Sequence, residues 1–162
     1  MNQLLVTTDN NLLRLEREFD APLADVWRAW TDAEILEQWW APLPFKAVSK
    51  TMNFTEGGKW HYYMLSPEGE KHWCIVNYEK IDLLKKFEAL DAFADEAGNI
   101  NTGLPGGQWL NEFAATATGS KVNCTLTYKT KEDVQRMVEM GMIEGITMTC
   151  NQLDELLKKI TA

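Results

Sequence analysis

The chain has 162 residues, of which 45% are hydrophobic and 25% are charged, and its formal net charge is −8. This length and this balance are typical of one globular domain, so we expect residues 1–162 to form a single domain. A negatively charged chain without a basic stripe repels the phosphate backbone, which excludes nucleic acid as an expected partner.

No apolar run approaches the roughly 20 residues that a membrane-spanning helix needs, so we expect no membrane insertion. The N-terminal stretch "MNQLLVTTDNN" has neither the basic region nor the apolar segment of a secretory signal. The three cysteines, Cys74, Cys124 and Cys150, are odd in number, and no pair has the spacing of metal ligands. Reduced thiols in a cytoplasmic protein are the simplest interpretation.

The first predicted strand is the strictly alternating stretch "LRLEREF", Leu13 to Phe19. The alternation places Arg17 on the same inward face as the apolar residues of the strand. A buried arginine needs a partner, so we favour an ion pair at the end of the sheet over a role in ligand binding.

Two short helices are predicted to follow. Residues 20–31 have apolar side chains at helical spacing, with Trp30 on the inward side, and Asp32 caps a second helix. Trp39 lies on the apolar side of that second helix, which Pro42 ends.

A long β region is predicted next, because short apolar stretches alternate with turns rich in glycine. The predicted strands cover residues 45–54, 58–66, 70–81, 84–94, 109–118 and 121–130. The sequence then turns helical over residues 131–160, with a break near Gly141, where the apolar face shifts around the helix axis. Only the second of these helices is long enough to cover the sheet. The predicted fold class is therefore α+β, with a strongly curved antiparallel sheet wrapped around a long C-terminal helix and two short helices after the first strand.

The hairpin around "SPEG" offers the sharpest metal hypothesis. If Leu65 opposes Glu70, then Trp60, Tyr62 and Trp73 share one face, and His61, His72 and Cys74 share the other. Two histidines and a cysteine on neighbouring strands could hold a transition metal. The aromatic face should point inward, however, which leaves both histidines on a solvated face without a fourth ligand. We therefore expect no metal and no cofactor.

No motif of a catalytic nucleophile or of a phosphate-binding loop is present, and strand carboxylates such as Glu79 and Glu112 are usually solvated, so we expect no enzyme activity. Bulky aromatic and methionine side chains remain, and such residues either line apolar pockets or fill a core. The candidate cavity-lining residues are Trp30, Trp39, Trp60, Tyr62, Trp73, Trp109, Phe113, Met137, Met140 and Met148. Arg17 and Glu112 are the candidate polar groups of this cavity.

Three stretches together resemble one family. They are "REFDAPLADVWRAWTDAEILEQWWAP" (residues 17–42), "GGKWHYYMLSPEG" (57–69) and "MGMIEGITMTCNQLDELL" (140–157). They are similar to the branch of the START-like, helix-grip superfamily (SRPBCC) named after the activator of the ATPase of the heat-shock chaperone of ninety kilodaltons, and the match runs over nearly the whole chain. The resemblance implies a helix-grip fold around a hydrophobic cavity, and it associates the chain with the stress response.

The sequence departs from that family in ways that affect function. Ile146 follows Gly145 where the family often has tryptophan. The chaperone activator also carries a separate N-terminal domain that contacts the chaperone, for which 162 residues leave no room. The resemblance therefore implies no chaperone activity by itself.

Three functions from different classes remain open. The leading one is a small soluble protein that binds a hydrophobic molecule, lipid-like or polyketide-like, in a cavity between the sheet and the C-terminal helix. The second is a regulatory module that binds a protein partner, a chaperone or another, through an exposed Trp40. The third is an enzyme of the cyclase or hydratase type, with Arg17, Tyr62 or Glu112 converging inside the cavity.

Overall fold

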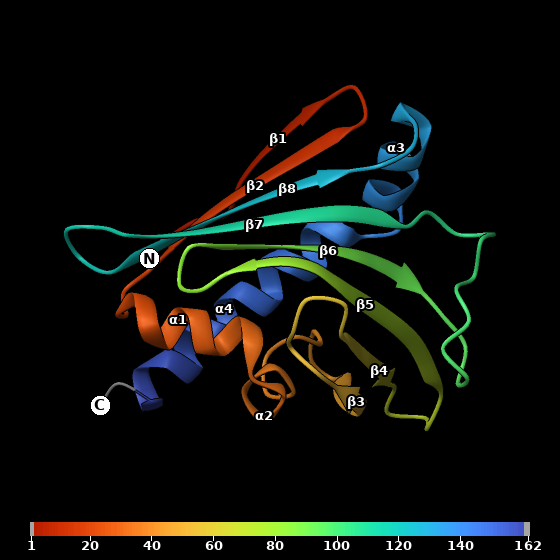
Figure 1. The fold of residues 1–162 in the computed structure, drawn as a ribbon, viewed down its shortest axis with the longest axis horizontal. Coiled ribbons are helices and arrows are strands. Elements are labelled where there is room, and N and C mark those ends of the chain that lie inside the picture. The colour runs from red at the N-terminus through yellow and green to blue at the C-terminus, as the bar shows by residue number, and fades with distance from the viewer. Residues whose placement is uncertain (1, 161–162) are drawn as a thin grey trace.

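The computed structural model describes residues 2–160 and has an α+β fold built on one eight-stranded antiparallel sheet, as the sequence predicts (Figure 1). The strands follow the order β1-β2-β8-β7-β6-β5-β4-β3 across the sheet. Their bounds are β1 (Leu5–Asp9), β2 (Leu12–Phe19), β3 (Lys46–Met52), β4 (Lys59–Leu65), β5 (Lys71–Asp82), β6 (Lys86–Phe93), β7 (Gly107–Ala115) and β8 (Ser120–Thr127).

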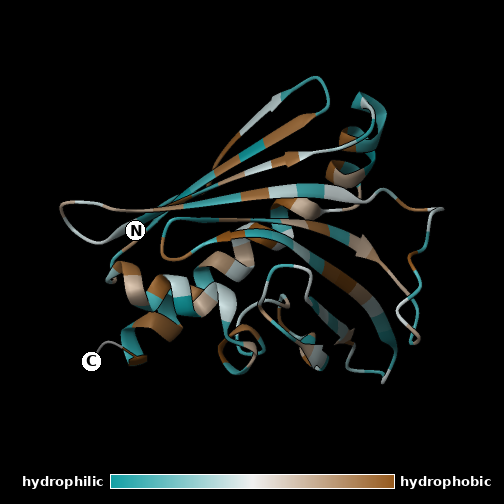
Figure 2. Cartoon of the chain, viewed as in Figure 1, coloured by the Kyte–Doolittle hydropathy of each residue, from teal (hydrophilic) through white to brown (hydrophobic). Residues whose placement is uncertain are grey.

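Four helices complete the fold: α1 (Leu23–Thr31), α2 (Ala33–Leu36), α3 (Lys131–Glu139) and α4 (Met142–Ile160). The long α4 runs along the inner side of the curved sheet, and α1 and α2 lie beside it toward one end (Figure 1). In Figure 2 apolar residues alternate with polar ones along the strands, which is the pattern of a sheet with one buried face.

The predicted break in the C-terminal helix is confirmed. Gly141 separates α3 from α4 with a φ of 92°, a left-handed conformation that glycine adopts without the steric strain of a Cβ atom. The side chain of Thr130 caps the start of α3 by accepting a hydrogen bond from the backbone N–H of Asp133. The chain therefore turns at Gly141 and directs α4 across the sheet.

One strand was not predicted from the sequence. Strand β1 pairs with β2 at the edge of the sheet, and the two are joined through Asn10, which has a φ of 55°. Four of the five residues of β1 are exposed, so the strand carries no alternation of apolar and polar residues that would indicate it.

The predicted register of the β4–β5 hairpin is wrong by one residue. Leu65 pairs with Lys71 and Trp60 with Val76, because Ser66 and Glu70 close a turn of three residues in which Gly69 has a φ of 92°. A slip of one residue moves every side chain of a strand to the other face of the sheet. Strand β5 therefore presents Cys74 to the interior, and the prediction that Trp73 faces inward is wrong.

Aromatic rings fill one part of the space between sheet and helices. The indole of Trp27 on α1 meets the rings of Phe54, Phe87 and Phe113 edge to face, with centroids 5.0 to 6.0 Å apart. Phe87 and Phe113 also stack on each other across β6 and β7. This cluster closes the interior beside α1, so any open space must lie farther along the sheet.

Candidate ligand-binding cavity

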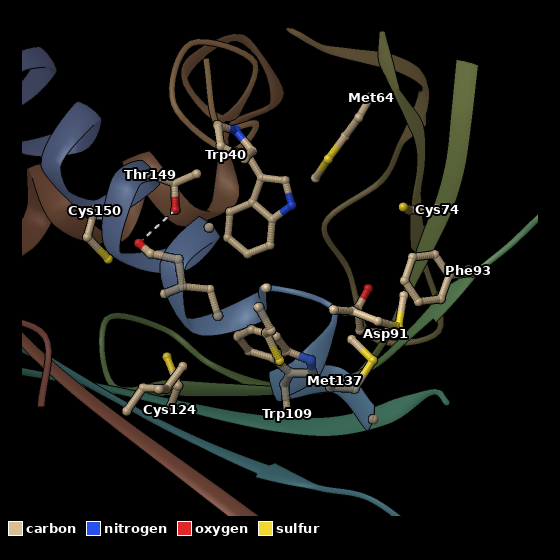
Figure 3. A pocket seen from close by; sticks show the side chains of 18 of the residues that line it. Trp40, Met64, Cys74, Asp91, Phe93, Trp109, Cys124, Met137, Thr149 and Cys150 are labelled. Carbon is tan, nitrogen blue, oxygen red and sulfur yellow. Dashed lines mark hydrogen bonds between the residues drawn. The ribbon is translucent and has the colours of Figure 1, made fainter. Parts of the chain in front are cut away.

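A cavity of about 390 Å³ lies between the inner face of the sheet, the α3–α4 junction and the segment after α2. Its volume is within the range of small-molecule sites in proteins, which is about 300 to 1,000 Å³. Its walls are mainly aromatic rings and the sulfur-containing side chains of Met64, Met137 and Met142, drawn in part in Figure 3.

The adjacent tryptophans after α2 have different roles. Trp39 is 1% exposed, and its indole N–H donates a hydrogen bond of 2.9 Å to the carbonyl of Ala29. Trp40 projects into the cavity, and its indole N–H donates to the hydroxyl of Tyr62 at 2.8 Å (Figure 3). Trp40 is half-buried and turned inward, so the expectation that it forms an exposed partner surface is wrong.

The structure brings seven of the predicted cavity residues into the wall: Arg17, Trp30, Trp39, Tyr62, Trp109, Met137 and Met140. Trp60 lies behind the wall, where its ring stacks on Tyr62 with centroids 3.8 Å apart and its N–H donates to Ser49 Oγ. Phe113 belongs to the aromatic cluster beside α1.

The other three predicted residues lie outside the cavity. Met148 is 46% exposed on α4. Glu112 is exposed on the outer face of β7 and borders a second hollow between β1, β2, β8 and β7. Trp73 packs on the outer face of the sheet against the ring of Tyr63. Trp73 lies on the outer face because the register of β5 differs by one residue from the predicted register.

The same shift separates the residues of the metal hypothesis. His61 is on the outer face but only 3% exposed, and its Nε2 donates to the carbonyl of Asp95 at 2.9 Å. His72 and Cys74 lie on the inner face and contribute to the cavity wall. The prediction that both histidines share a solvated face is therefore wrong. Among the residues that the structure describes, no three His, Cys, Asp or Glu side chains gather in a way that could hold a metal ion.

Arg17 has the acidic partner that the sequence led us to expect. Its guanidinium, 3% exposed, forms an ion pair with Asp154 of α4 and also donates to Asn151 Oδ1 at 3.2 Å. A third hydrogen bond goes to the carbonyl of Glu18. The donors of Arg17 are thus directed at protein groups, although its side chain touches the cavity.

The polar residue that sequence reasoning missed is Asp91. It lies on β6, where it shares the inward face with Phe87 and Ala89, and its side chain lines the cavity (Figure 3). Burial raises the pKa of Asp91 from 3.8 to about 7. The backbone N–H of Ala92 and the indole N–H of Trp109 oppose this rise, although the indole makes no hydrogen bond of standard geometry with a described residue. The alternation along "FEALDAF" could have identified Asp91 as an inward carboxyl.

All three cysteines line the cavity as free thiols. Burial raises the pKa of both Cys74 and Cys150 to about 12, and it raises the pKa of Cys124 as well. Thiols with such pKa values are protonated at neutral pH, and the protonated form is a poor nucleophile. These cysteines therefore act as small apolar parts of the wall.

The comparisons with known proteins agree with the fold. Residues 20–158 match the family model described as Activator of Hsp90 ATPase homolog 1-like protein. A crystal structure of a Mycobacterium smegmatis protein is 32% identical, with a TM-score of 0.86, over 95% of this chain and 96% of the other.

Two solution NMR structures are similar to the same degree. A protein of Arthrobacter aurescens is 32% identical with a TM-score of 0.89, over 96% of this chain and 91% of its own. A protein of Staphylococcus epidermidis is 30% identical with a TM-score of 0.85, over 95% of this chain and 93% of its own. No curated protein matches the sequence. Within residues 2–160, no helix combines the length and the apolar character needed to cross a membrane.

Proposed function

The chain belongs to the family of Activator of Hsp90 ATPase homolog 1-like proteins, and on that basis we propose that it binds a hydrophobic small molecule, lipid-like or polyketide-like, in the cavity beneath α4. The fold of this family is commonly a ligand-binding or regulatory module. The observation that carries the proposal is the cavity of about 390 Å³ with its mainly apolar wall. Burying apolar ligand surface there contributes about 25 cal/mol per Å² before the losses of association.

We propose binding without turnover. The thiols in the wall are protonated, and the guanidinium of Arg17 is engaged by Asp154. Glu112, a candidate acid for a cyclase or hydratase, lies on the opposite face of β7. Among residues 2–160, Asp91 is the one carboxyl that lines the cavity, so the described wall offers no second carboxyl for an acid–base pair.

The test is to fill the cavity from α4. Gly145 is a residue of α4 that lines the cavity, and a Cβ atom placed there would meet only Pro42 Cγ, at 3.9 Å. Gly145→Leu replaces glycine by a better helix former, and the leucine side chain occupies ligand space. Thr147→Leu adds the same side chain at an exposed position of α4 and is the matched control.

The probe is the neutral fluorophore N-phenyl-1-naphthylamine, whose emission rises in an apolar site. We expect saturable binding to the native protein, with quenching of the cavity tryptophans, and at least about tenfold weaker binding to Gly145→Leu. Thr147→Leu should bind as the native protein does. Equal affinity of the native protein and Gly145→Leu, or no saturable binding at all, would refute the proposal. If the native protein binds the probe and Gly145→Leu does not, native mass spectrometry of the protein from its own cells would identify the ligand that it retains.

A further inference from the structure

Asp91 lies on β6 between two neighbouring strands of the sheet, and its side chain lines the cavity. Its partners across the sheet are Val76 on β5 and Gly107 on β7. Gly107 has no side chain, and a Cβ atom there would come within 3.0 Å of the ring of Tyr128. The ring of Tyr128 thus covers the backbone beside Asp91, and Figure 3 shows the carboxyl near Phe93 and on the side of the cavity toward α3.

No described cation neutralises this carboxyl. The ion pairs within residues 2–160 join other carboxylates, and none of them includes Asp91. Arg17, the cavity's guanidinium, is held by Asp154, and the imidazole of His72 lies 4.0 Å from Glu70. A carboxylate in an apolar cavity without a counter-ion is unfavourable, so a ligand that supplies the counter-ion gains binding energy there.

The surroundings of Asp91 suit a cation in a second way. The indole rings of Trp40 and Trp109 lie in the same wall with centroids 6.3 Å apart, and Tyr62 adjoins them. The π faces of such rings attract ammonium groups. The indole N–H of Trp109 adjoins the carboxyl of Asp91 but makes no hydrogen bond of standard geometry with a described residue, so it does not replace a counter-ion.

We propose that the cavity selects an apolar molecule that carries a protonated amine, with the ammonium group on Asp91 and the apolar body between Trp40, Trp109 and the methionines of α3 and α4. This inference rests on the proposed function and adds the ligand's charge and orientation. The ammonium donates a charge-assisted hydrogen bond to the carboxylate, which is the stronger type of hydrogen bond.

The other titratable groups around Asp91 stay neutral near pH 7. Burial raises the pKa of Tyr62 on β4, of Cys74 and Tyr78 on β5, and of Tyr128 after β8. Each of these groups is uncharged when protonated. Asp91 is therefore the group in this part of the wall whose ionised form a bound ammonium group would stabilise.

The test compares three probes of one shape: 1-naphthylmethylamine, 1-naphthylmethanol and 1-naphthylacetate, each titrated by calorimetry near neutral pH. We expect the amine to bind at least about tenfold more tightly than the alcohol, and the carboxylate to bind most weakly. Asp91→Asn, which keeps the size of the side chain, should remove the advantage of the amine and leave the affinity for the alcohol unchanged. Asp82→Asn, at an exposed position of β5, is the control and should leave all three affinities unchanged.

The outcomes separate the two proposals. If the alcohol binds as tightly as the amine, or if Asp91→Asn binds the amine as the native protein does, the selection of amines is refuted and the apolar cavity remains a binding site. If none of the three probes binds, both proposals fail. The ranking of the probes on the native protein needs no variant, so the inference stays testable if a variant folds poorly.

Discussion

The buried carboxyl of Asp91 should make the protein less stable as pH rises, and Asp91→Asn should remove that effect. In the unfolded chain Asp91 loses its proton near its ordinary pKa of 3.8, whereas in the folded protein it does so near 7. The folded state thus holds the proton more tightly, so the contribution of Asp91 to stability is full below pH 3.8 and is lost as pH rises through about 7. A tenfold change in an ionisation constant is about 1.4 kcal/mol, so the full loss is on the order of 4 kcal/mol. Asp91 is half-buried and solvent that enters the cavity screens it, which reduces the expected loss to about 2–4 kcal/mol.

The assay is urea unfolding of the native protein and Asp91→Asn at several values of pH between about 4 and 8.5. Asparagine cannot ionise. The free energy of unfolding of Asp91→Asn, relative to that of the native protein, should therefore rise by about 2–4 kcal/mol from the acidic to the alkaline end of this range. Every other titrating group is common to both proteins and cancels in the difference. Asp82→Asn should show a constant difference across the range, because this side chain is exposed. A difference between native protein and Asp91→Asn that does not change with pH would refute the reasoning.

Three further predictions concern the frame of the cavity, and each is checked by urea unfolding at neutral pH. Gly141→Ala should lower the free energy of unfolding by about 1–2 kcal/mol, because alanine is strained at a φ of 92°. Gly145→Ala, inside α4, should raise it by up to about 1 kcal/mol. Changes of the same sign for both variants would contradict a helix break at Gly141. Trp60→Ala should lose about 3–5 kcal/mol, since the ring is 1% exposed, and a loss below about 1 kcal/mol would contradict its place behind the wall. Arg17→Met should lose about 3 kcal/mol and Asp154→Leu in the same chain should restore part of it, which an unpaired Arg17 would not allow.

The fold was predictable because its signals are local and repeated. The alternation of residues 13–19 fixes β2, and the change to a helical period after residue 130 fixes the C-terminal helices, with the shift of the apolar face marking Gly141. Strand β1 was not predictable in this way, since an exposed edge strand has no buried face to produce a period.

The site was less predictable because it depends on registers that no local pattern determines. Leu65 pairs with Lys71 and not with Glu70, and this difference of one residue places Cys74 on the inner face of β5 and Trp73 on the outer face. Pairing across the sheet also decides that Asp91 lies beside Gly107, although the two positions are 16 residues apart. Aromatic content predicts an apolar interior, but the space left in that interior depends on which rings pack in the cluster beside α1.

The two charged side chains of the wall illustrate how a buried charge can indicate a ligand. Arg17 and Asp91 both line the cavity. The charge of Arg17 is matched by Asp154 and by two further acceptors of the chain, so it needs nothing from a ligand and stabilises the contact between β2 and α4. Asp91 meets the backbone N–H of Ala92, the indole N–H of Trp109 and protonated hydroxyl and thiol groups, but its ionised form has no cationic partner among the described residues. The cationic group of a bound ligand would pair with this carboxylate and restore the free energy of unfolding that the protein loses as pH rises through neutrality. The pH dependence of folding is therefore linked to the charge of the ligand.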